Sequence, residues 1–313
     1  MPHPDVLMIG PYPAWDMEAM EGAFRVHRYW EAADKQAYVA ERAASIRAIA
    51  TRGELGASGA LIAALPQLEI ISCYGVGTDA IDLAAARARG IKVTNTPDVL
   101  TEDVADIAIG LLLSVARQIP QGDRYARDGK WKTANMVLTQ RFFGKRIGIV
   151  GMGRIGAAIA RRAEAFNMTI SYFARSEHKE LPYRYCSSIV ELAGASDFLV
   201  AAVAGGAATR GLIGADAFKA LGPDGCFVNV ARGTVVDEAA LLDALESRTI
   251  RAAGLDVFLN EPNIDPRFLA LDNVVLQPHH GSGTIETRKA MGQLVRDNLA
   301  AHFAGKPLLS EVR

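Results

Sequence analysis

The sequence predicts an α/β protein made of two doubly wound parallel sheets, each with its own hydrophobic core. Short β-rich runs alternate with Ala-rich helical patterns along almost the whole chain, which is typical of parallel sheets covered by helices. A length of 313 residues is enough for two domains of ordinary size. Half of the residues are apolar and 22% are charged, as in globular proteins. Two such units predict an interdomain cleft, with ligands bound beyond the carboxyl ends of the strands.

The composition excludes several functional classes. Lys and Arg number 34 against 35 Asp and Glu, a formal charge of -1, so bulk charge favours neither nucleic acid nor a membrane surface as a partner. Cys73, Cys186 and Cys226 form no CxxC pair, and the chain has no HExxH pattern, so we expect no disulfide framework and no metal site. The first residues lack the features of a signal peptide, and no apolar stretch approaches the ~20 residues that span a bilayer. We therefore expect a cytoplasmic protein.

Four apolar runs in the first third of the chain predict strands. They are VLMIG (6–10), SIRAIAT (45–51), LEIISCYG (68–75) and IKVTNT (91–96). Helical patterns lie between them at 58–66 and 79–90, and the second ends at Gly90, as helices commonly do. The stretch TEDVADIAIGLLLSVARQ (101–118) predicts a long apolar helix that leads into the second unit, with acids in its first turn as the helix dipole favours.

A second α/β series begins at residue 145. Its candidate strands are KRIGIVG (145–151), TISYFA (169–174), DFLVAAV (197–203), CFVNVA (226–231), RAAGLDVF (251–258) and NVVLQPH (273–279). The segment 285–305 predicts a last amphipathic helix. The residues that suggest chemistry directly follow the strands of this series.

Gly151, Gly153 and Gly156 form a GxGxxG pattern between the apolar run RIGIV and a helical pattern. In such turns the first glycine makes the turn, the second lets the backbone approach a pyrophosphate, and the third packs helix on strand. The N-terminus of the helix then faces the anion. Because a strand precedes the pattern and a helix and a second strand follow it, the pattern predicts a dinucleotide site rather than a purely structural turn.

The end of the second strand of this series carries a cation where many dinucleotide sites carry a carboxylate. An Asp or Glu about twenty residues beyond the glycines usually holds a ribose hydroxyl. Here that place reads Ala174, Arg175, Ser176. A guanidinium forks onto a ribose 2′-phosphate and a hydroxyl adds a further hydrogen bond, so we expect NADPH to be preferred over NADH. A solvated surface arginine is the alternative interpretation of Arg175.

Arg232, Glu261 and His279 each follow a candidate strand. Singly, they fit a loop arginine, a turn acid and a strand-capping histidine equally well. Together they predict acid–base chemistry on a carbonyl. A carboxylate favours the protonated imidazole, which can then donate a proton to a carbonyl oxygen during hydride transfer. The guanidinium would orient the carbonyl and stabilise the developing charge.

Six stretches resemble the D-isomer-specific 2-hydroxyacid dehydrogenase family, and the resemblance runs from end to end. They are GVGTDAIDL, NTPDVLTEDVADIAIGLLL, GMGRIG, NVARGTVVDEAAL, GLDVFLNEP and PHHGSGT, of which the last four are highly specific in this order and spacing. Within the family the chain is similar to the NADPH-dependent glyoxylate/hydroxypyruvate reductases and to the plant hydroxyphenylpyruvate reductases. Those proteins also favour GRIG…AEAF…Y…RS and GSGTxETR.

The resemblance implies a flavodoxin-like substrate domain at residues 1–98 and 287–313 and a Rossmann NADP-binding domain at 99–286. It implies a catalytic trio of Arg232, Glu261 and His279, with His279 chosen over His280 because the family's histidine directly follows the proline. Arg232 and His279 would also bind substrate, and the backbone N–H groups of Val76 and Gly77 would bind its carboxylate. The implied cofactor contacts are Gly151, Met152, Gly153, Arg154, Ile155, Gly156, Ala174, Arg175, Ser176, Val230, Ala231, Arg232 and Asp256. A homodimer through the cofactor domain is implied as well.

The chain departs from the family at Val203 and Gly205, where a Pro and a Thr are common, so we expect a more flexible loop there. The implied activity is NADPH-dependent reduction of a small 2-oxo acid, glyoxylate to glycolate or hydroxypyruvate to D-glycerate. An aryl 2-oxo acid of the hydroxyphenylpyruvate type is the alternative, because Tyr74 and Trp131 can either shorten a pocket or stack on an aryl ring. A non-enzymatic nicotinamide-sensing binding protein is the alternative from another class. Arg175 disfavours phosphoglycerate dehydrogenase, and Glu261 disfavours formate dehydrogenase.

Overall fold

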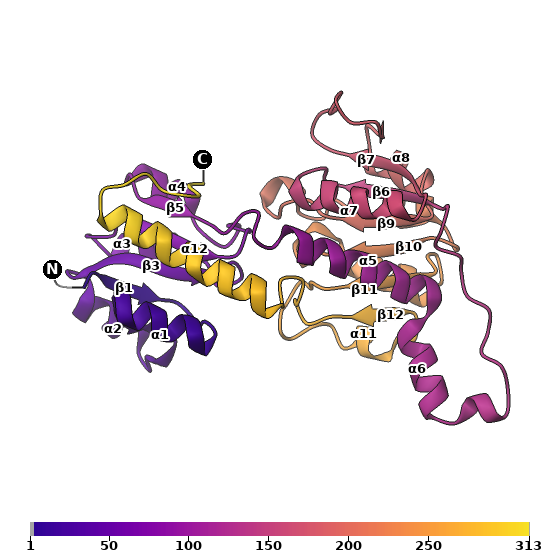
Figure 1. Ribbon diagram of the computed structural model, residues 1–313, viewed down its shortest axis with the longest axis horizontal. Helices are drawn as coiled ribbons and strands as arrows, with labels where there is room; N and C mark the ends of the chain where they lie inside the picture. Colours follow the sequence, from indigo (N-terminus) through magenta and orange to yellow (C-terminus); the bar gives the residue numbers. More distant parts are fainter. Residues whose placement is uncertain (1–2, 313) are drawn as a thin grey trace. The chain divides into compact units, whose positions relative to one another are not determined.

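The computed structural model describes residues 3–312, which divide into two compact units (Figure 1). The first unit holds the described residues up to Leu100 and those from Ser282 onward, and the second is Thr101–Gly281. The sequence predicted boundaries after residues 98 and 286, whereas the units divide after Leu100 and Gly281. The first unit is therefore built from both ends of the chain, and the second is contiguous.

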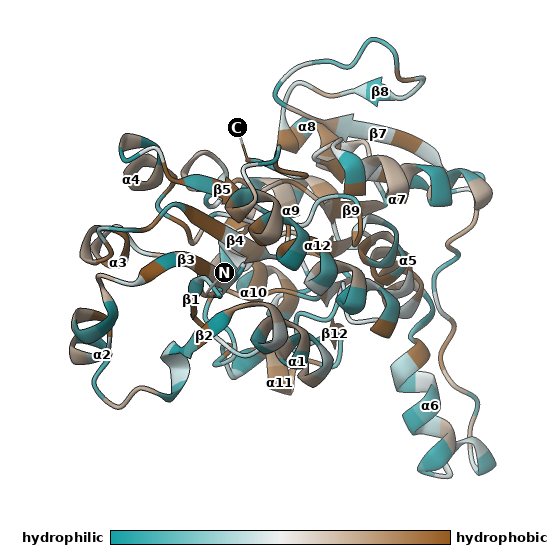
Figure 2. Ribbon diagram, turned by 60° about the vertical axis from the view of Figure 1, so that its left-hand side comes forward, coloured by the Kyte–Doolittle hydropathy of each residue, from teal (hydrophilic) through white to brown (hydrophobic). Residues whose placement is uncertain are grey.

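The first unit contains a five-stranded parallel sheet in the order β2-β1-β3-β4-β5. Its strands are β1 (Asp5–Met8), β2 (Arg25–Arg28), β3 (Ile46–Arg52), β4 (Ile70–Tyr74) and β5 (Lys92–Thr94). The interior strands β3 and β4 are largely buried, because helices cover both faces of the sheet. Figure 2 shows the hydrophobic colouring of β4.

Helices pack on both sides of this sheet. On one side α1 (Ala14–Ala23) lies against the C-terminal helix α12 (Ile285–Phe303), which also packs on β4 (Figure 1). Side chains of α2 (Lys35–Arg42), α3 (Gly59–Ala64) and α4 (Leu83–Ala88) join strand residues in one hydrophobic cluster. Gly90 follows α4 with φ +68°, as predicted for its C-terminus.

The second unit contains a seven-stranded parallel sheet in the order β12-β11-β10-β9-β6-β7-β8. Its strands are β6 (Arg146–Val150), β7 (Thr169–Phe173), β8 (Arg184–Tyr185), β9 (Phe198–Ala201), β10 (Cys226–Asn229), β11 (Ala252–Leu255) and β12 (Val274–Leu276). The strand order reverses between β6 and β9. Ligands of such sheets bind at this switch point, beyond the carboxyl ends of the strands.

Helices cover both faces of the second sheet as well. The long helix α5 (Thr101–Arg117) packs against α7 (Arg154–Ala165) and against β10 and β11. The opposite face carries α8 (Ile189–Gly194), α9 (Ala215–Leu221) and α10 (Glu238–Glu246), whose apolar side chains form one cluster with the strands. The short helix α11 (Arg267–Ala270) precedes β12. The predicted fold class, two doubly wound parallel α/β domains, is confirmed.

Two edge strands were not predicted from the sequence. β2 reads RVHR, with charged or partly exposed side chains along its whole length, and β8 has only two residues. Edge strands bury little apolar surface, so neither carries the periodicity by which strands are recognised.

An arm projects from the second unit after α5. It consists of α6 (Ile119–Arg127), the 3-10 helix η2 (Lys130–Lys132) and an irregular segment that leads to β6. Gln118 separates α5 from α6 with a left-handed backbone conformation. Within residues 3–312, no helix is long and apolar enough to cross a membrane.

Candidate active site

The glycine turn after β6 has the geometry that a phosphate-binding turn needs. Gly151 has φ +98°, a backbone conformation that favours glycine. A Cβ there would also lie 2.7 Å from the backbone of Val203, so a side chain is disfavoured for both reasons. A Cβ on Gly153 would meet no atom within 4 Å, which leaves its backbone open to a ligand. A Cβ on Gly156 would lie 2.0 Å from the carbonyl oxygen of Gly151, so only glycine permits this helix to pack on the turn. These contacts match the three roles predicted for the glycines.

The turn leads directly into α7, which starts without a side-chain cap. Gly153 is the N-cap residue and supplies no side-chain acceptor, so no capping side chain occupies the N–H groups of the first helical turn. The side chain of Met152 is buried, that of Ile155 is half-buried, and that of Arg154 is exposed. Gly151 donates to the carbonyl of Phe173 at 2.8 Å, which ties the turn to the end of β7. Arg175 and Ser176 follow there, both exposed, and the half-buried Ala174 accepts a hydrogen bond from the Tyr185 hydroxyl at 3.4 Å.

A buried asparagine shapes the segment that carries Arg232. Asn229, the last residue of β10, is only 2% exposed. Its side chain accepts the N–H of Ala231 at 3.0 Å and donates to the carbonyl of Arg232 at 3.0 Å. Val230 and Ala231 are buried, and Arg232 is half-buried, with one guanidinium N–H on the carbonyl of Ala231 at 2.8 Å. Sequence reasoning did not single out Asn229, although a polar residue ending a buried strand needs partners and so marks a turn.

Glu261 and His279 form the predicted pair. The Nδ1 atom of His279 lies 2.6 Å from Oε2 of Glu261, while Oε1 of Glu261 accepts the N–H of Phe258 at 2.8 Å. Burial raises the pKa of the Glu261 carboxyl, but the hydrogen bond and charge of His279, the Phe258 N–H and the charge of Arg232 together lower it below its ordinary value. The carboxylate therefore stays ionised at neutral pH, and the ring atom Nε2 of His279 is left for other chemistry.

The segments that bear Arg232 and Glu261 touch at Gly233. A Cβ on Gly233 would lie 2.0 Å from the carbonyl carbon of Phe258 and 2.4 Å from the nitrogen of Leu259. Only a glycine allows the two backbones to approach so closely. The sheet thereby brings together three residues that are far apart in the sequence, because β10, β11 and β12 are neighbours and end at the same edge.

Asp256 holds the backbone of the histidine segment. The residue is 2% exposed; its Oδ1 accepts the N–H of His280 at 2.7 Å, and its Oδ2 accepts that of Gly281 at 2.9 Å. Burial raises the pKa of this carboxyl, and the two N–H donors and the neighbouring histidines only partly oppose that rise. His279 itself has φ +53°, a left-handed conformation that is uncommon outside glycine. The sequence predicted Asp256 as a cofactor contact. In the structure its carboxylate also binds the backbone N–H groups of His280 and Gly281.

The predicted carboxylate-binding residues belong to the first unit. Gly75, Val76 and Gly77 follow β4 in a turn held by Thr96, whose hydroxyl accepts the Gly75 N–H at 3.1 Å. The carbonyl of Val76 accepts the Asn95 side chain at 2.8 Å. Within the described part of the chain, the N–H groups of Val76 and Gly77 have no acceptor. Two neighbouring amides of this kind suit an anion.

Neither aromatic candidate for substrate size behaves as a simple pocket wall. Tyr74 is 3% exposed, its ring packs on that of Tyr12, and its hydroxyl donates toward the carbonyl of Arg288 and a carboxylate oxygen of Asp16. Its ring is therefore part of the core of the first unit. Trp131 lies on the arm and is 72% exposed. Neither ring therefore distinguishes a small from an aryl substrate.

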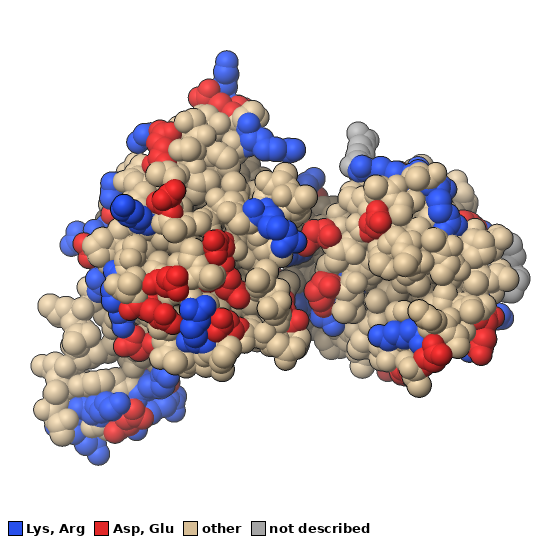
Figure 3. Space-filling model, turned by 180° about the vertical axis from the view of Figure 1, so that it is seen from behind, with Lys and Arg blue, Asp and Glu red and all other residues tan. Residues whose placement is uncertain are grey.

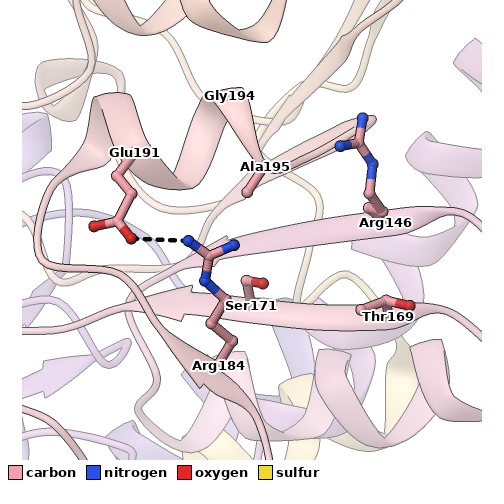
Figure 4. A pocket seen from close by; sticks show the side chains of 7 residues that line it. All are labelled: Arg146, Thr169, Ser171, Arg184, Glu191, Gly194 and Ala195. Atoms are coloured by element: carbon pink, nitrogen blue, oxygen red, sulfur yellow. Dashed lines mark hydrogen bonds and ion pairs between the residues drawn. The ribbon is translucent and has the colours of Figure 1, made fainter.

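A hollow of about 480 Å³ in the second unit lies away from these residues (Figure 4). It is lined by Arg146, Thr169, Ser171, Arg184, Glu191, Gly194 and Ala195, and thus sits toward the starts of β6 and β7, opposite the edge that carries the glycine turn. Its two guanidinium groups are neutralised, Arg184 by Glu191 at 3.0 Å and Arg146 by Asp197 at 2.8 Å. We assign this hollow no ligand.

The residues described between 3 and 312 contain no group of three or more His, Cys, Asp or Glu that could hold a metal ion. The site instead consists of a glycine turn at the switch point and a Glu–His pair beside an arginine. The sheet and the turn define the class of dinucleotide-binding α/β proteins.

Comparisons with known proteins agree with this class and narrow it. Residues 109–281 match the NAD-binding domain of the D-isomer-specific 2-hydroxyacid dehydrogenases. The chain is 48% identical to a hydroxyphenylpyruvate reductase of Plectranthus scutellarioides over 307 residues, 98% of each chain. Its fold is similar to a 2-hydroxyacid dehydrogenase of Ketogulonicigenium vulgare, with 54% identity, a TM-score of 0.93 and coverage of 100% and 99%. It is also similar to an NADPH-dependent glyoxylate/hydroxypyruvate reductase of Sinorhizobium meliloti bound to NADP and malonate, with 44% identity, a TM-score of 0.93 and coverage of 99% and 97%.

The chain belongs to the D-isomer-specific 2-hydroxyacid dehydrogenase family. The resemblance drawn from the sequence is confirmed.

Proposed function

We propose that the protein is an NADPH-dependent reductase of small 2-oxo acids, such as glyoxylate and hydroxypyruvate. The observation that carries the proposal is the 2.6 Å contact between Glu261 and His279, on a segment packed directly against that of Arg232. A pair of this kind supplies a proton to a carbonyl oxygen. The similarity to a reductase described as NADPH-dependent supports the choice of cofactor and substrate class.

The glycine turn fits a nicotinamide dinucleotide. Gly153 leaves open space above the backbone, and the uncapped start of α7 presents N–H groups to a pyrophosphate. When bound, the cofactor supplies the hydride. Arg175 and Ser176 would bind the 2′-phosphate of NADPH, since both are exposed at the end of β7. The remaining proposed contacts are Met152, Arg154, Ile155, Ala174, Val230, Ala231 and Asp256.

His279 would hold the proton that the carbonyl oxygen receives. Because Nδ1 faces Glu261, Nε2 is the atom placed to donate that proton, and Glu261 stabilises the positive charge that the ring carries beforehand. Arg232 would bind the carbonyl oxygen and the carboxylate of the substrate with its forked N–H groups. In the reverse direction the neutral ring would accept the proton of the hydroxyl.

The free amides of Val76 and Gly77 are proposed to bind the substrate carboxylate. An anionic substrate is therefore required, because a neutral ketone would leave anion-binding groups without their partner. A comparison of kcat/KM for glyoxylate, hydroxypyruvate, 4-hydroxyphenylpyruvate and a neutral ketone, each with NADPH and NADH, tests the proposal. We expect the small acids with NADPH to be reduced fastest. Faster reduction of the aryl acid would favour the alternative, which the 48% identity to a hydroxyphenylpyruvate reductase supports.

Replacing Glu261 by Gln should change the pH dependence of reduction. The carboxylate favours the protonated ring of His279, so its loss should move the fall of kcat with rising pH to lower pH. In the wild-type protein the pKa of Glu261 is below its ordinary value, so on the acidic side the pair is lost only when the pH falls through that lowered value. Steady-state kcat measured from pH 5 to 9 checks this, and superimposable profiles would mean that the pair does not control the proton.

A cytoplasmic homodimer completes the proposal. The arm after α5 exposes apolar side chains, including Trp131 and Leu138, which is 94% exposed, and a second copy would cover them. Lys and Arg also gather on this arm, as Figure 3 shows at its lower left. The mass in solution, measured by light scattering, tests the dimer. Cys73, Cys186 and Cys226 are buried thiols, which fits a reducing compartment.

A further inference from the structure

Glu238, the first residue of α10, has a carboxylate that does not cap its own helix. Asp237 is the N-cap of α10, and its side chain accepts the N–H of Ala240 at 3.1 Å. Glu238 comes next, is half-buried, and points away to the segment that follows β11. There its Oε2 accepts the N–H of Leu259, 21 residues along the chain, at 2.8 Å.

That N–H lies where two functional segments meet. The nitrogen of Leu259 is among the atoms closest to Gly233, the residue after Arg232. The preceding N–H, that of Phe258, donates to Glu261 at 2.8 Å. Two consecutive N–H groups are thus held by two carboxylates, one belonging to the Glu–His pair and one to Glu238. Glu261 and Glu238 therefore bind the same short backbone segment, residues 258–259, through neighbouring N–H groups.

We infer that Glu238 is a positioning residue of the reductase: by holding the N–H of Leu259 it fixes residues 258–261, and with them the carboxylate that orients His279. This inference rests on the proposed function. In this role Glu238 acts through Glu261 and not on the reacting atoms.

Burial, one hydrogen bond and several charged groups act on the carboxyl of Glu238. Burial raises the pKa of its carboxyl, and the charges of Asp265 and Glu261 raise it further, against the Leu259 N–H and Arg267. The groups that face this region are thus Glu261, Asp265 and Arg267, with Arg232 and His279 beyond Glu261. The Leu259 N–H opposes this rise in the pKa of Glu238, as expected of a donor that holds the ionised carboxylate.

Two substitutions separate the hydrogen bond from the charge. Glu238→Met removes the acceptor at similar volume, and we expect kcat to fall between about 10- and 100-fold, the scale of misplaced catalytic groups, with little change in KM for the 2-oxo acid. Glu238→Gln keeps an acceptor oxygen at the same position, so its kcat should stay near the wild-type value.

Asp237→Ala is the matched control. It removes the cap of the same helix, and so lowers the thermal midpoint, without touching the Leu259 N–H. If Glu238→Met behaves like Asp237→Ala, with a lower midpoint and unchanged kcat, Glu238 contributes only to stability and the inference is wrong. If Glu238→Met does not fold, Glu238→Ala, which also removes the acceptor, is measured in its place, and the same outcomes decide.

A readout without turnover separates this inference from the proposed function. In protein labelled with 15N-histidine, the His279 ring resonances, assigned with His279→Gln, report its proton and its bond to Glu261. They should change in Glu238→Met and stay unchanged in Asp237→Ala. If no 2-oxo acid is reduced but the resonances change, the proposed function fails and the positioning role stands. Unchanged resonances in Glu238→Met overturn the positioning role whatever the activity.

Discussion

His279→Ala should lower kcat for reduction of a 2-oxo acid by about 10²- to 10⁴-fold, the usual contribution of a positioned general acid. The physical reason is the loss of the ring that Glu261 holds at 2.6 Å, and with it the proton for the carbonyl oxygen. Binding of NADPH, measured by fluorescence titration, should remain nearly intact, because the glycine turn and the end of β7 are untouched.

Two further variants make this result specific. His280→Ala changes the neighbouring, exposed ring but keeps the backbone N–H that binds Asp256, so it should retain wild-type activity. His279→Asn tolerates the left-handed backbone at this position and should be as inactive as the alanine variant. Activity in His279→Asn, or its loss in His280→Ala, would move the proton donor elsewhere.

Arg175→Asp should reverse the preference from NADPH to NADH. The change removes charge-assisted hydrogen bonds worth roughly 1.5–3 kcal/mol each and adds repulsion toward a 2′-phosphate. The ratio of kcat/KM for the two cofactors should therefore shift by at least about 10- to 100-fold. The new carboxylate can also accept a hydrogen bond from a ribose hydroxyl, which would improve the use of NADH.

Lys179→Asp is the control for that substitution, since it makes the same charge change at an exposed position of the same loop. It should leave the cofactor preference unchanged. A wild-type protein that prefers NADH tenfold, or equal effects of both substitutions, would show that Arg175 is a solvated surface arginine after all.

The strands with buried faces could be predicted from the sequence. Strands that are covered on both faces read as short continuous apolar runs, bounded by Gly- and Pro-containing turns. The edge strands β2 and β8 were not predicted, because each pairs with a single neighbouring strand and buries little apolar surface. The glycine turn was predictable because each of its glycines is required by a different steric constraint. The structure shows two of these constraints as the close contacts that a Cβ would make at Gly151 and Gly156.

The supporting residues of the candidate site were harder to predict than the principal ones. Arg232, Glu261 and His279 are rare side chains at strand ends, whereas Asn229, Asp256 and Glu238 act through backbone N–H and carbonyl groups. Which N–H a side chain reaches depends on the approach of segments that are distant in the sequence, such as Gly233 and Phe258. Residue types alone do not encode that approach, so these roles emerge only from the fold.

The discontinuous make-up of the first unit sets the order in which the chain can fold during synthesis. Its sheet is translated first, but α12, which packs on β4 and places Arg296 2.7 Å from the buried Asp16, comes from the last residues of the chain. At about 5–20 residues per second, the ribosome needs roughly 10–40 s to add the intervening unit, which is contiguous and can fold at once. The second unit, Thr101–Gly281, is thus fully synthesised before the first unit has its C-terminal helix. Until α12 emerges, Asp16 and one apolar face of the nascent sheet lack their cover, and in that interval the newborn chain is most open to chaperones and to aggregation.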